Sequence, residues 1–456
     1  MKWWLKLLQN PLILGLLFVH LLLLLFTQFT AWPEMLIYPY LLEHGFAFYG
    51  DIVQPYMPFL PYVLSVVFRL FGLSVVTLQY FTVGVIVVID LVLLRIVQTH
   101  YKLLSPETVL AIFIALQVFF SGNGMWFDLF AVVPLLAAFY FALQYLNSEK
   151  MQDALAAGFA LGIGIITKQT AVWFLMPLLI MVYTRNRKAI LPMLLIASIP
   201  FISLLIFFRV SDIWNWAIVY PLLKMAKTPG YTLYPNAREL IILLILLLPL
   251  FLSFIHRGKR LQKPHFIMLW LIAAFGFLFP RFAWFHIQPL APFLAIAVTT
   301  IFLTKKNSVM VKIGKFGYLA FLLLLVLRLV TQELFLPVRF FEPEVIARTA
   351  ILSTLVPHDQ PVFFYNDMGN EMVAGQFLPV KPWAYTFPWY MEIPGLENEI
   401  ITALERDRVQ WVIAKPFGNE DQYVPGSYRP QLIDAYVQSH FGLVTTVDDL
   451  TILKRL

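Results

Sequence analysis

Charged side chains are rare in this chain, and several of them gather where long apolar runs break. Glu34 and Asp51 lie in an aromatic stretch after the first apolar run, and Lys168 and Arg281 lie in the later breaks IITKQTAV and PRFAWFHIQP. A carboxylate can take a proton from a hydroxyl group, and a cation can stabilise negative charge that develops on an oxygen. If these groups share one side of a membrane, they are candidates for one reaction site.

Each candidate also has a purely structural interpretation. Lys168 and Arg281 can extend from helix ends to the membrane surface, and Asp128, in GNGMWFD, can cap the helix that begins there. His286 has no second histidine nearby in sequence, which favours packing or hydrogen bonding over metal binding. Asp90 lies inside an apolar run, so its carboxyl group must be protonated or paired with a partner that the sequence does not identify.

The composition is that of a polytopic membrane protein. Of the 456 residues, 60% are hydrophobic and 13% are charged, with 42 Phe and 12 Trp, far from the average of soluble domains. The net charge of +7 does not indicate nucleic-acid binding, because the positive residues cluster in short loops between apolar runs. The chain contains no cysteine, which excludes disulfides and thiolate metal sites.

Apolar runs recur along residues 1–334, which we predict to be an all-α membrane bundle. Several runs are shorter than the roughly 20 residues of a typical span, so we expect a crowded bundle in which some helix ends are buried in protein. The sequence predicts about eleven spans, at residues 11–31, 75–97, 107–121, 129–146, 153–167, 170–184, 189–208, 240–256, 266–280, 289–304 and 316–334.

Residues 32–73 are predicted to form the first extracytoplasmic loop, with two short surface helices. The first helix starts at Pro33 and stops near Gly45, and we expect Pro39 to kink or divide it. The second, Pro58–Phe71, extends over about 21 Å, which is short for a span. We therefore expect it to lie along the membrane surface, the alternative being a short span.

The distribution of positive residues favours the surface helix. If Pro58–Phe71 does not cross, the basic clusters at 257–263 and 305–315 lie on the cytoplasmic side, as positive residues prefer. If it crosses, both clusters lie outside. The first arrangement predicts a multi-pass protein of the cell (inner) membrane with a cytoplasmic N-terminus and with the candidate residues Glu34, Lys168 and Arg281 outside.

Residues 335–456 have an ordinary share of polar residues and are predicted to form a small extracytoplasmic α/β domain, here called the tail. The sequence contains no phosphate-binding glycine loop and no nucleophile elbow, so we expect a lid or recognition role. The expected strands are Gln360–Tyr365, Val409–Ala414 and Leu443–Leu453, and the expected helices are Glu397–Arg406 and Pro430–Ser439.

Three segments in this order resemble a known family. They are the first loop, with LLEHG followed by YGDIVQPYMPFLPYVLSVVFRLFG, then LGIGIITKQTA, and then PRFAWFHIQPLAPFLAI. In order and spacing, residues 1–334 resemble the bacterial polyprenyl-phosphate-dependent glycosyltransferases of the GT-C fold. That group includes protein mannosyltransferases, aminoarabinose transferases and the RgtA/B/C/D-like enzymes that modify lipopolysaccharide.

The resemblance implies transfer of a hexose or pentose from a polyprenyl-phosphate donor to an acceptor hydroxyl on a glycan, lipid or protein, without a metal or other cofactor. It implies a carboxylate base, Glu34 or Asp51, and groups that bind the donor phosphate or substrate, namely Lys168, Arg281, His286, Tyr56 and Asp128. The family usually starts the first loop with an Asp-Glu pair. Here Pro33 and Glu34 occupy that region, so either acid remains a candidate base.

Two other functions compete with this one. A transporter or lipid flippase without covalent chemistry predicts repeated halves and polar residues deep in several spans, whereas the sequence shows no convincing repeat and Asp90 is nearly alone at depth. A noncatalytic assembly partner would not need an ordered set of acids and bases at the ends of the spans.

Overall fold

The computed structural model describes residues 9–227, 232–254, 263–279, 281–303, 309–367, 369–384, 388–391, 393–416 and 430–456. The chain divides into two compact units. The first, here called the helical unit, comprises Met1–Thr30, Gln79–Phe207 and Tyr234–Leu336. The second, here called the loop–tail unit, comprises Ala31–Leu78, Phe208–Leu233 and Pro337–Leu456.

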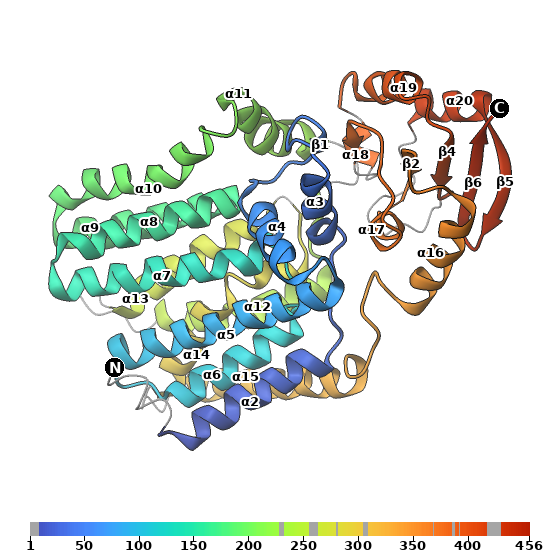
Figure 1. Cartoon of the computed structure of the whole chain (residues 1–456). Coiled ribbons are helices and arrows are strands. Elements are labelled where there is room, and N and C mark those ends of the chain that lie inside the picture. Colours follow the sequence, from blue (N-terminus) through green and yellow to red (C-terminus); the bar gives the residue numbers. More distant parts are fainter. Residues whose placement is uncertain are drawn as a thin grey trace. The chain divides into compact units, whose positions relative to one another are not determined.

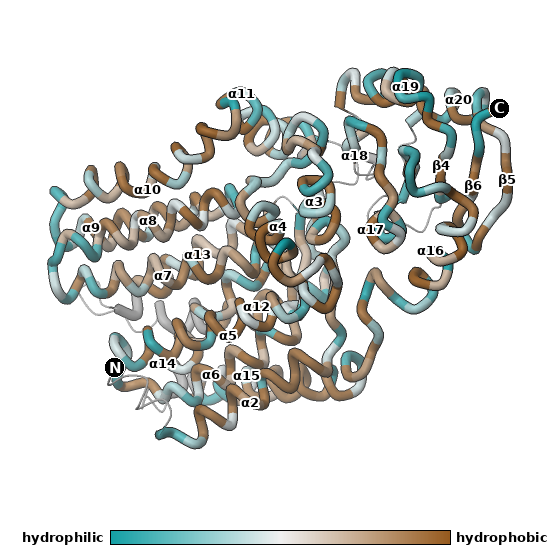
Figure 2. Tube along the Cα trace, viewed as in Figure 1, coloured by the Kyte–Doolittle hydropathy of each residue, from teal (hydrophilic) through white to brown (hydrophobic). Residues whose placement is uncertain are grey.

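The helical unit is built from apolar helices, which Figure 2 shows as predominantly hydrophobic. Every span that the sequence predicted overlaps one of them. The helices are α2 (Pro11–Phe26), α5 (Val75–His100, whose first turn belongs to the other unit), α6 (Pro106–Phe119), α7 (Phe127–Ser148), α8 (Met151–Thr167), η1 (Gln169–Phe174), α9 (Leu175–Arg185), η2 (Arg187–Ala189), α10 (Ile190–Leu204), α12 (Ala237–Phe254), α13 (Lys263–Ala274), η5 (Phe275–Leu278), η6 (Trp284–Ile287), α14 (Ala291–Leu303) and α15 (Val309–Gln332).

Helix length limits how many of these elements can be counted as spans. Within the described residues, 4 helices are long and apolar enough to cross a membrane, at Val75–His100, Phe127–Ser148, Arg187–Leu204 and Lys312–Gln332. Shorter apolar helices occur at Pro11–Phe26, Pro106–Phe119, Met151–Thr167, Phe266–Leu278 and Ala291–Thr300. The predicted total of eleven spans is therefore not confirmed. The basic cluster at 257–263, apart from Lys263, and residues 305–308 of the second cluster lie outside the described residues.

Two glycines of α8 allow close packing against α10. Helices α7, α8 and α10 lie side by side (Figure 1), with α8 packed against both neighbours. A Cβ atom on Gly158 would lie 2.5 Å from the Met193 carbonyl oxygen, and one on Gly162 would lie 2.3 Å from the Ala197 carbonyl oxygen. Only a residue without a side chain lets the α8 and α10 backbones approach so closely.

The loop–tail unit joins the predicted first loop to the tail. Its elements are α3 (Glu34–Glu43), β1 (Ile52–Val53), α4 (Phe59–Phe71), α11 (Val210–Ile213), the π-helix η3 (Trp214–Lys224), η4 (Met225–Lys227), α16 (Pro343–Leu355), β2 (Val362–Tyr365), α17 (Asn370–Ala374), β3 (Trp383–Ala384), α18 (Pro388–Met391), α19 (Leu396–Arg406), β4 (Trp411–Ala414), α20 (Gln431–His440), β5 (Phe441–Val447) and β6 (Leu450–Arg455). Helix α3 continues through Pro39, so of the two expected effects, a kink or a division, the division is wrong.

The tail contains a four-stranded sheet in the order β2-β4-β6-β5, in which β2 and β4 are parallel and the other pairs are antiparallel. A small C-terminal sheet is present, as the sequence predicted, whereas the tail shares its compact unit with residues 31–78 and 208–233. Its last strand, predicted over Leu443–Leu453, is instead the hairpin of β5 and β6. The hairpin turns at Asp448, whose φ of 52° is the left-handed conformation that tight turns require.

The loop and the tail are connected by backbone pairing. Strand β1 pairs with β3 in parallel, with Ile52 opposite Trp383, and the Trp383 N–H donates to the Asp51 carbonyl oxygen at 2.6 Å. The Tyr40 hydroxyl donates to the Phe377 carbonyl oxygen at 3.1 Å. The first loop is thus integrated into the fold of the tail.

Helix α4 exposes apolar side chains as well as burying them, which is compatible with the predicted surface helix. Leu60, Leu64 and Phe68 are buried, whereas the opposite face exposes apolar side chains such as Val66 and Leu70. An exposed apolar stripe on a short helix is typical of a helix that lies in a membrane interface. Its position on the membrane surface stays a prediction.

Candidate functional site

Three of the sequence-predicted residues meet inside the helical unit. Asp128 lies in the first turn of α7, Lys168 lies in the extended break between α8 and η1, and His286 lies in η6. They are 40 and 118 positions apart along the chain, and the packing of α7 against both η1 and η6 brings them together. We call this group the buried triad.

The contacts in the triad are short and shielded from solvent. The Lys168 ammonium lies 2.7 Å from both carboxylate oxygens of Asp128, and His286 Nδ1 lies 2.9 Å from Asp128 Oδ2. The relative exposure of the side chains is 0% for Asp128, 6% for Lys168 and 8% for His286. The triad therefore overturns two structural interpretations, since Lys168 does not extend to the surface and the Asp128 carboxylate binds side chains instead of capping the helix.

Hydrogen-bond counting shows what the triad can offer a ligand. His286 Nδ1 lies 3.2 Å from Lys168 Nζ as well as close to Asp128, so it either donates to the carboxylate or accepts from the ammonium. If it donates, one of the three ammonium protons is not used within the triad. If it accepts, the proton on its Nε2 is not used there. Either tautomer leaves one donor for an anionic or oxygen-rich ligand.

Aromatic rings and a further cation accompany the triad. Lys168 Nζ lies 5.3 Å from the centroid of the Phe277 ring, which favours the charged ammonium. The Trp126 and Phe285 rings pack edge to face at 5.7 Å. Arg281 is half-buried, five positions before His286 in sequence. These groups provide apolar surface and positive charge in the segments that carry the triad.

A second buried network identifies the partner of Asp90. His20 Nδ1 lies 2.8 Å from Asp90 Oδ2, and His20 Nε2 lies 3.1 Å from Gln117 Oε1. All three side chains are buried, and they tie α2, α5 and α6 together. Sequence reasoning singled out Asp90 but missed His20, although His20 is also a polar residue within an apolar run.

The second network reaches the segment that carries His286. Gln117 donates through Nε2 to the Gly122 carbonyl oxygen at 2.9 Å. Gln288, two positions after His286, donates to the carbonyl oxygens of Gln117 at 3.3 Å and Phe120 at 3.1 Å. The hydrogen bonds of Gln288 therefore attach the end of η6 to the end of α6.

The two candidate bases belong to the loop–tail unit. Glu34 is the first residue of α3 and is buried, where its charge is favoured by the helix dipole. Asp51 is partly exposed, accepts from the Ala47 N–H at 2.8 Å and lies 3.4 Å from Lys381 Nζ. Tyr56 is half-buried, and its carbonyl oxygen accepts from the Tyr49 hydroxyl at 2.8 Å. Asp51 therefore already holds its own turn and a lysine of the tail.

In the part of the chain that the structure describes, no group of three or more His, Cys, Asp or Glu side chains is placed to hold a metal ion. The expectation that the protein works without a metal stays a prediction.

No protein-family model and no curated protein sequence matches the chain. Among solved structures it is similar to ArnT from Cupriavidus metallidurans bound to undecaprenyl phosphate, with a TM-score of 0.62 and 12% identity over 98% of this chain and 97% of that one. The apo state of the same ArnT gives a TM-score of 0.60 and 11% identity over 100% and 98%. Archaeal AglB from Archaeoglobus fulgidus, in complex with an inhibitory peptide and a dolichol-phosphate, gives 0.49 and 12% over 97% and 74%.

The similarity to ArnT extends over almost the whole of both chains, so it includes the helical unit as well as the tail. Together with the apolar helices, it means that the chain is a multi-pass membrane protein with the GT-C fold.

Proposed function

We propose that the chain is a membrane glycosyltransferase that moves a sugar from a polyprenyl-phosphate donor to an acceptor hydroxyl on a glycan, lipid or protein outside the cytoplasm. The observation that carries this proposal is the buried triad of Asp128, Lys168 and His286 in a chain with the GT-C fold. The ArnT structure with that fold contains bound undecaprenyl phosphate, a lipid of the class that the proposed reaction would release.

The proposed reaction is a displacement at the anomeric carbon of the donor sugar. A carboxylate takes the proton from the acceptor hydroxyl, and the hydroxyl oxygen forms a bond to the anomeric carbon. The bond from that carbon to the phosphate oxygen breaks, and polyprenyl phosphate leaves with the electron pair. The step needs no oxidant and no metal, because side-chain cations can stabilise the charge on the departing phosphate.

Donor binding is assigned to the buried triad and Arg281. Asp128 holds Lys168 and His286 in place, and the donor that the triad does not use internally is available to a phosphate oxygen. Fixed donors need little reorganisation as charge develops, which is how such groups accelerate transfer. Tyr56 is assigned to substrate contact through its ring.

Glu34 is assigned as the base, and Asp51 as a residue that positions the loop. Two contacts support the positioning role of Asp51, because its carboxylate is engaged by the Ala47 N–H and by Lys381. Asp51 would be the base if Glu34 is structural. General-base assistance contributes about 10² to 10⁴ in rate, so Glu34→Gln is expected to lose most of its turnover and to keep its affinity for the donor lipid.

The test uses the full chain in lipid nanodiscs with a radiolabelled polyprenyl-phosphate sugar and a cell-envelope extract. Covalent label on a new acceptor supports the transferase, whereas movement of unchanged lipid across the bilayer would identify the competing flippase. Lys168→Gln is expected to weaken donor binding by about 10- to 150-fold, the equivalent of about 1.5 to 3 kcal/mol for a charge-assisted contact. The exposed Lys188 supplies the control, since Lys188→Gln should bind and transfer normally.

A separate comparison distinguishes the two acids. Lys381→Met removes the ion pair of Asp51 but leaves its carboxylate. If Asp51 only positions the loop, Asp51→Asn and Lys381→Met should reduce turnover to a similar extent. An inactive Asp51→Asn beside a nearly normal Lys381→Met and a nearly normal Glu34→Gln would assign the base to Asp51.

A further inference from the structure

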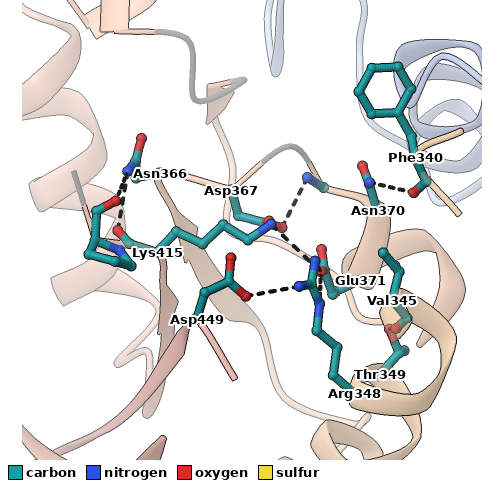
Figure 3. Close-up of polar contacts among 12 residues, drawn as sticks. Phe340, Val345, Arg348, Thr349, Asn366, Asp367, Asn370, Glu371, Lys415 and Asp449 are labelled. Atoms are coloured by element: carbon teal, nitrogen blue, oxygen red, sulfur yellow. Dashed lines mark hydrogen bonds and ion pairs between the residues drawn. The ribbon is translucent and has the colours of Figure 1, made fainter. Parts of the chain in front are cut away.

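A buried ionic cluster lies in the tail where the parallel strands β2 and β4 end (Figure 3). Lys415 Nζ lies 2.7 Å from Asp367 Oδ1 and 3.7 Å from Glu371 Oε1. The Arg348 guanidinium bonds to the Glu371 carboxylate and lies 2.8 Å from Asp449 at the edge of the cluster. Both the Asp367 and Glu371 side chains have a relative exposure of 0%.

The charges in this cluster depend on one another. Burial, followed by the charge of Asp367, raises the pKa of Glu371 to about 7, while Lys415 and Arg348 act in the opposite direction. Burial alone would raise the pKa of Asp367, but the Lys415 ammonium holds it below its usual value. Asp367 and Glu371 share the Lys415 ammonium, so removal of Lys415 would leave the buried Asp367 carboxylate without its cation. The four side chains therefore hold one another in a single arrangement.

This arrangement fixes a short turn between β2 and α17. Asp367 Oδ2 accepts from the Gly369 N–H at 3.0 Å, and Gly369 adopts a φ of 80°, which favours glycine. Asn370 donates to the Phe340 carbonyl oxygen at 2.6 Å. Glu371 continues the turn into α17, so the two buried carboxylates of the cluster lie on either side of Gly369.

The turn lies directly against α3, the helix that begins with Glu34. Helix α17 packs on α3, and a Cβ atom on Gly369 would lie 2.6 Å from Ile37 Cδ1. Ile37 is completely buried and lies three positions after Glu34, on the next turn of the same helix. A shift of Gly369 toward α3 would therefore meet Ile37 first.

We propose that Glu371, held by Arg348 and Lys415, is a positioning residue for the transfer reaction. It acts through Gly369 and Ile37 on the orientation of Glu34. The tail would thus help to orient the proposed base. This inference rests on the proposed function of Glu34 as the base.

The contact between Gly369 and Ile37 provides a direct test. Gly369→Ala requires a displacement of about 1 Å before the new Cβ atom reaches an ordinary distance of 3.4–4 Å from Ile37. A misplacement of that size at a reacting group costs about 10²-fold in rate. We expect kcat of Gly369→Ala to fall by about 10- to 100-fold while the donor Kd, measured with a radiolabelled polyprenyl-phosphate sugar, stays within about twofold.

Ile37→Val tests whether the loss passes through α3, because it removes the Cδ1 atom that the new side chain would strike. Ile37→Val alone should stay within about twofold of wild-type kcat, since it removes one methyl group away from the reacting atoms. The double variant should regain most of the kcat lost in Gly369→Ala, although the backbone strain at residue 369 is unchanged. No regain in the double variant would overturn the coupling.

Two further measurements keep the test decisive. Glu371→Gln should lower kcat at least fivefold with donor Kd retained, an effect of about 1 kcal/mol, whereas Glu399→Gln, at an exposed position of the same domain, should not. Wild-type kcat in Glu371→Gln would overturn the proposal. If Gly369→Ala does not fold, Glu371→Gln still tests the proposal, because it leaves the contact between Gly369 and Ile37 in place.

Glu34→Gln in the same assay separates the two possible failures. An active Glu34→Gln variant removes the proposed base and the inference with it. An inactive Glu34→Gln variant, together with additive effects of Gly369→Ala and Ile37→Val, removes only the inference and leaves the proposed function in place.

Discussion

Asp128→Asn is the most informative single change in the helical unit, because it separates the structural role of the buried triad from its chemical role. The substitution keeps the size of the side chain and an acceptor oxygen for His286, but it removes the negative charge that holds Lys168. The ammonium then remains at 6% exposure without a countercharge in the triad. Asp128→Asn should therefore lower both stability and donor binding. Adding Lys168→Gln should restore stability but not donor binding.

The burial of the Asp128–Lys168 pair determines how much the free energy of unfolding should change. Exposed ion pairs contribute about 0–1 kcal/mol, whereas removal of one partner of a buried pair costs about 3–5 kcal/mol. The two 2.7 Å contacts and the complete burial of Asp128 place this pair in the second class. We therefore expect Asp128→Asn to lower the free energy of unfolding by about 3–5 kcal/mol.

The matched control is the exposed ion pair between Arg185 and Glu149, whose side chains are 43% and 55% exposed. Glu149→Gln should change stability by no more than about 1 kcal/mol. Melting temperatures of purified protein in detergent, with and without polyprenyl phosphate, compare the variants. The double variant Asp128→Asn/Lys168→Gln should regain most of the stability, because no unpaired charge is left, but should not regain donor binding or transfer.

Two results would refute this reasoning. If Asp128→Asn melts like Glu149→Gln, the pair does not have the energetics of buried charges. If the double variant recovers both stability and donor binding, Lys168 is a structural residue and the phosphate is bound elsewhere.

Two further predictions concern packing and pH. Gly162→Ala should lower the melting temperature, because its Cβ atom would lie 2.3 Å from the Ala197 carbonyl oxygen and would force α8 and α10 apart, whereas Gly84→Ala, where nothing lies within 4 Å, is the control. The pKa of Glu371 is raised from 4.5 to about 7 in the fold, so its contribution to stability is fully present below pH 4.5 and is lost as the pH rises to about 7. Between these pH values the free energy of unfolding should fall by about 3 kcal/mol because of Glu371. If the melting temperature of Glu371→Gln depends on pH as steeply as that of wild type, the prediction is wrong.

The sequence was most informative about elements whose pattern is local. Each predicted apolar run overlaps a helix, and the predicted helices of the tail match α19 and α20 within a few residues, because helix periodicity and capping are read within one segment. The hairpin of β5 and β6 was missed, since its two strands are separated by only two residues. Asp448 and Asp449 were the only local signal of the turn.

Sequence patterns did not predict which side chains far apart in the chain contact each other. The types of Asp128, Lys168 and His286 marked them as candidates, but their 40- and 118-position separations left their contact undetermined. Asp90 was predicted to be protonated or paired, and the residue that it contacts, His20, lies 70 positions away. Residue chemistry predicts that a buried charge must be paired, while the choice of partner depends on how the helices pack.

Because sequence patterns do not show contacts between distant residues, they could not decide whether Glu34 or Asp51 is the base. The contacts of both residues also change how their variants should be interpreted. Composition divides the chain near residue 335, but Asp51 is bound by Lys381 from the tail, a contact that no composition change reveals. Loss of activity in Asp51→Asn is therefore expected whether the residue is a base or a support of the turn, because its carboxylate also accepts from the Ala47 N–H. Glu34 begins a helix that the tail holds through Ile37, so its orientation can be disturbed without altering its carboxylate. Activity loss caused by moving Glu34 and activity loss caused by neutralising it are thus separate observations, and agreement between them would identify the base more securely than either substitution alone.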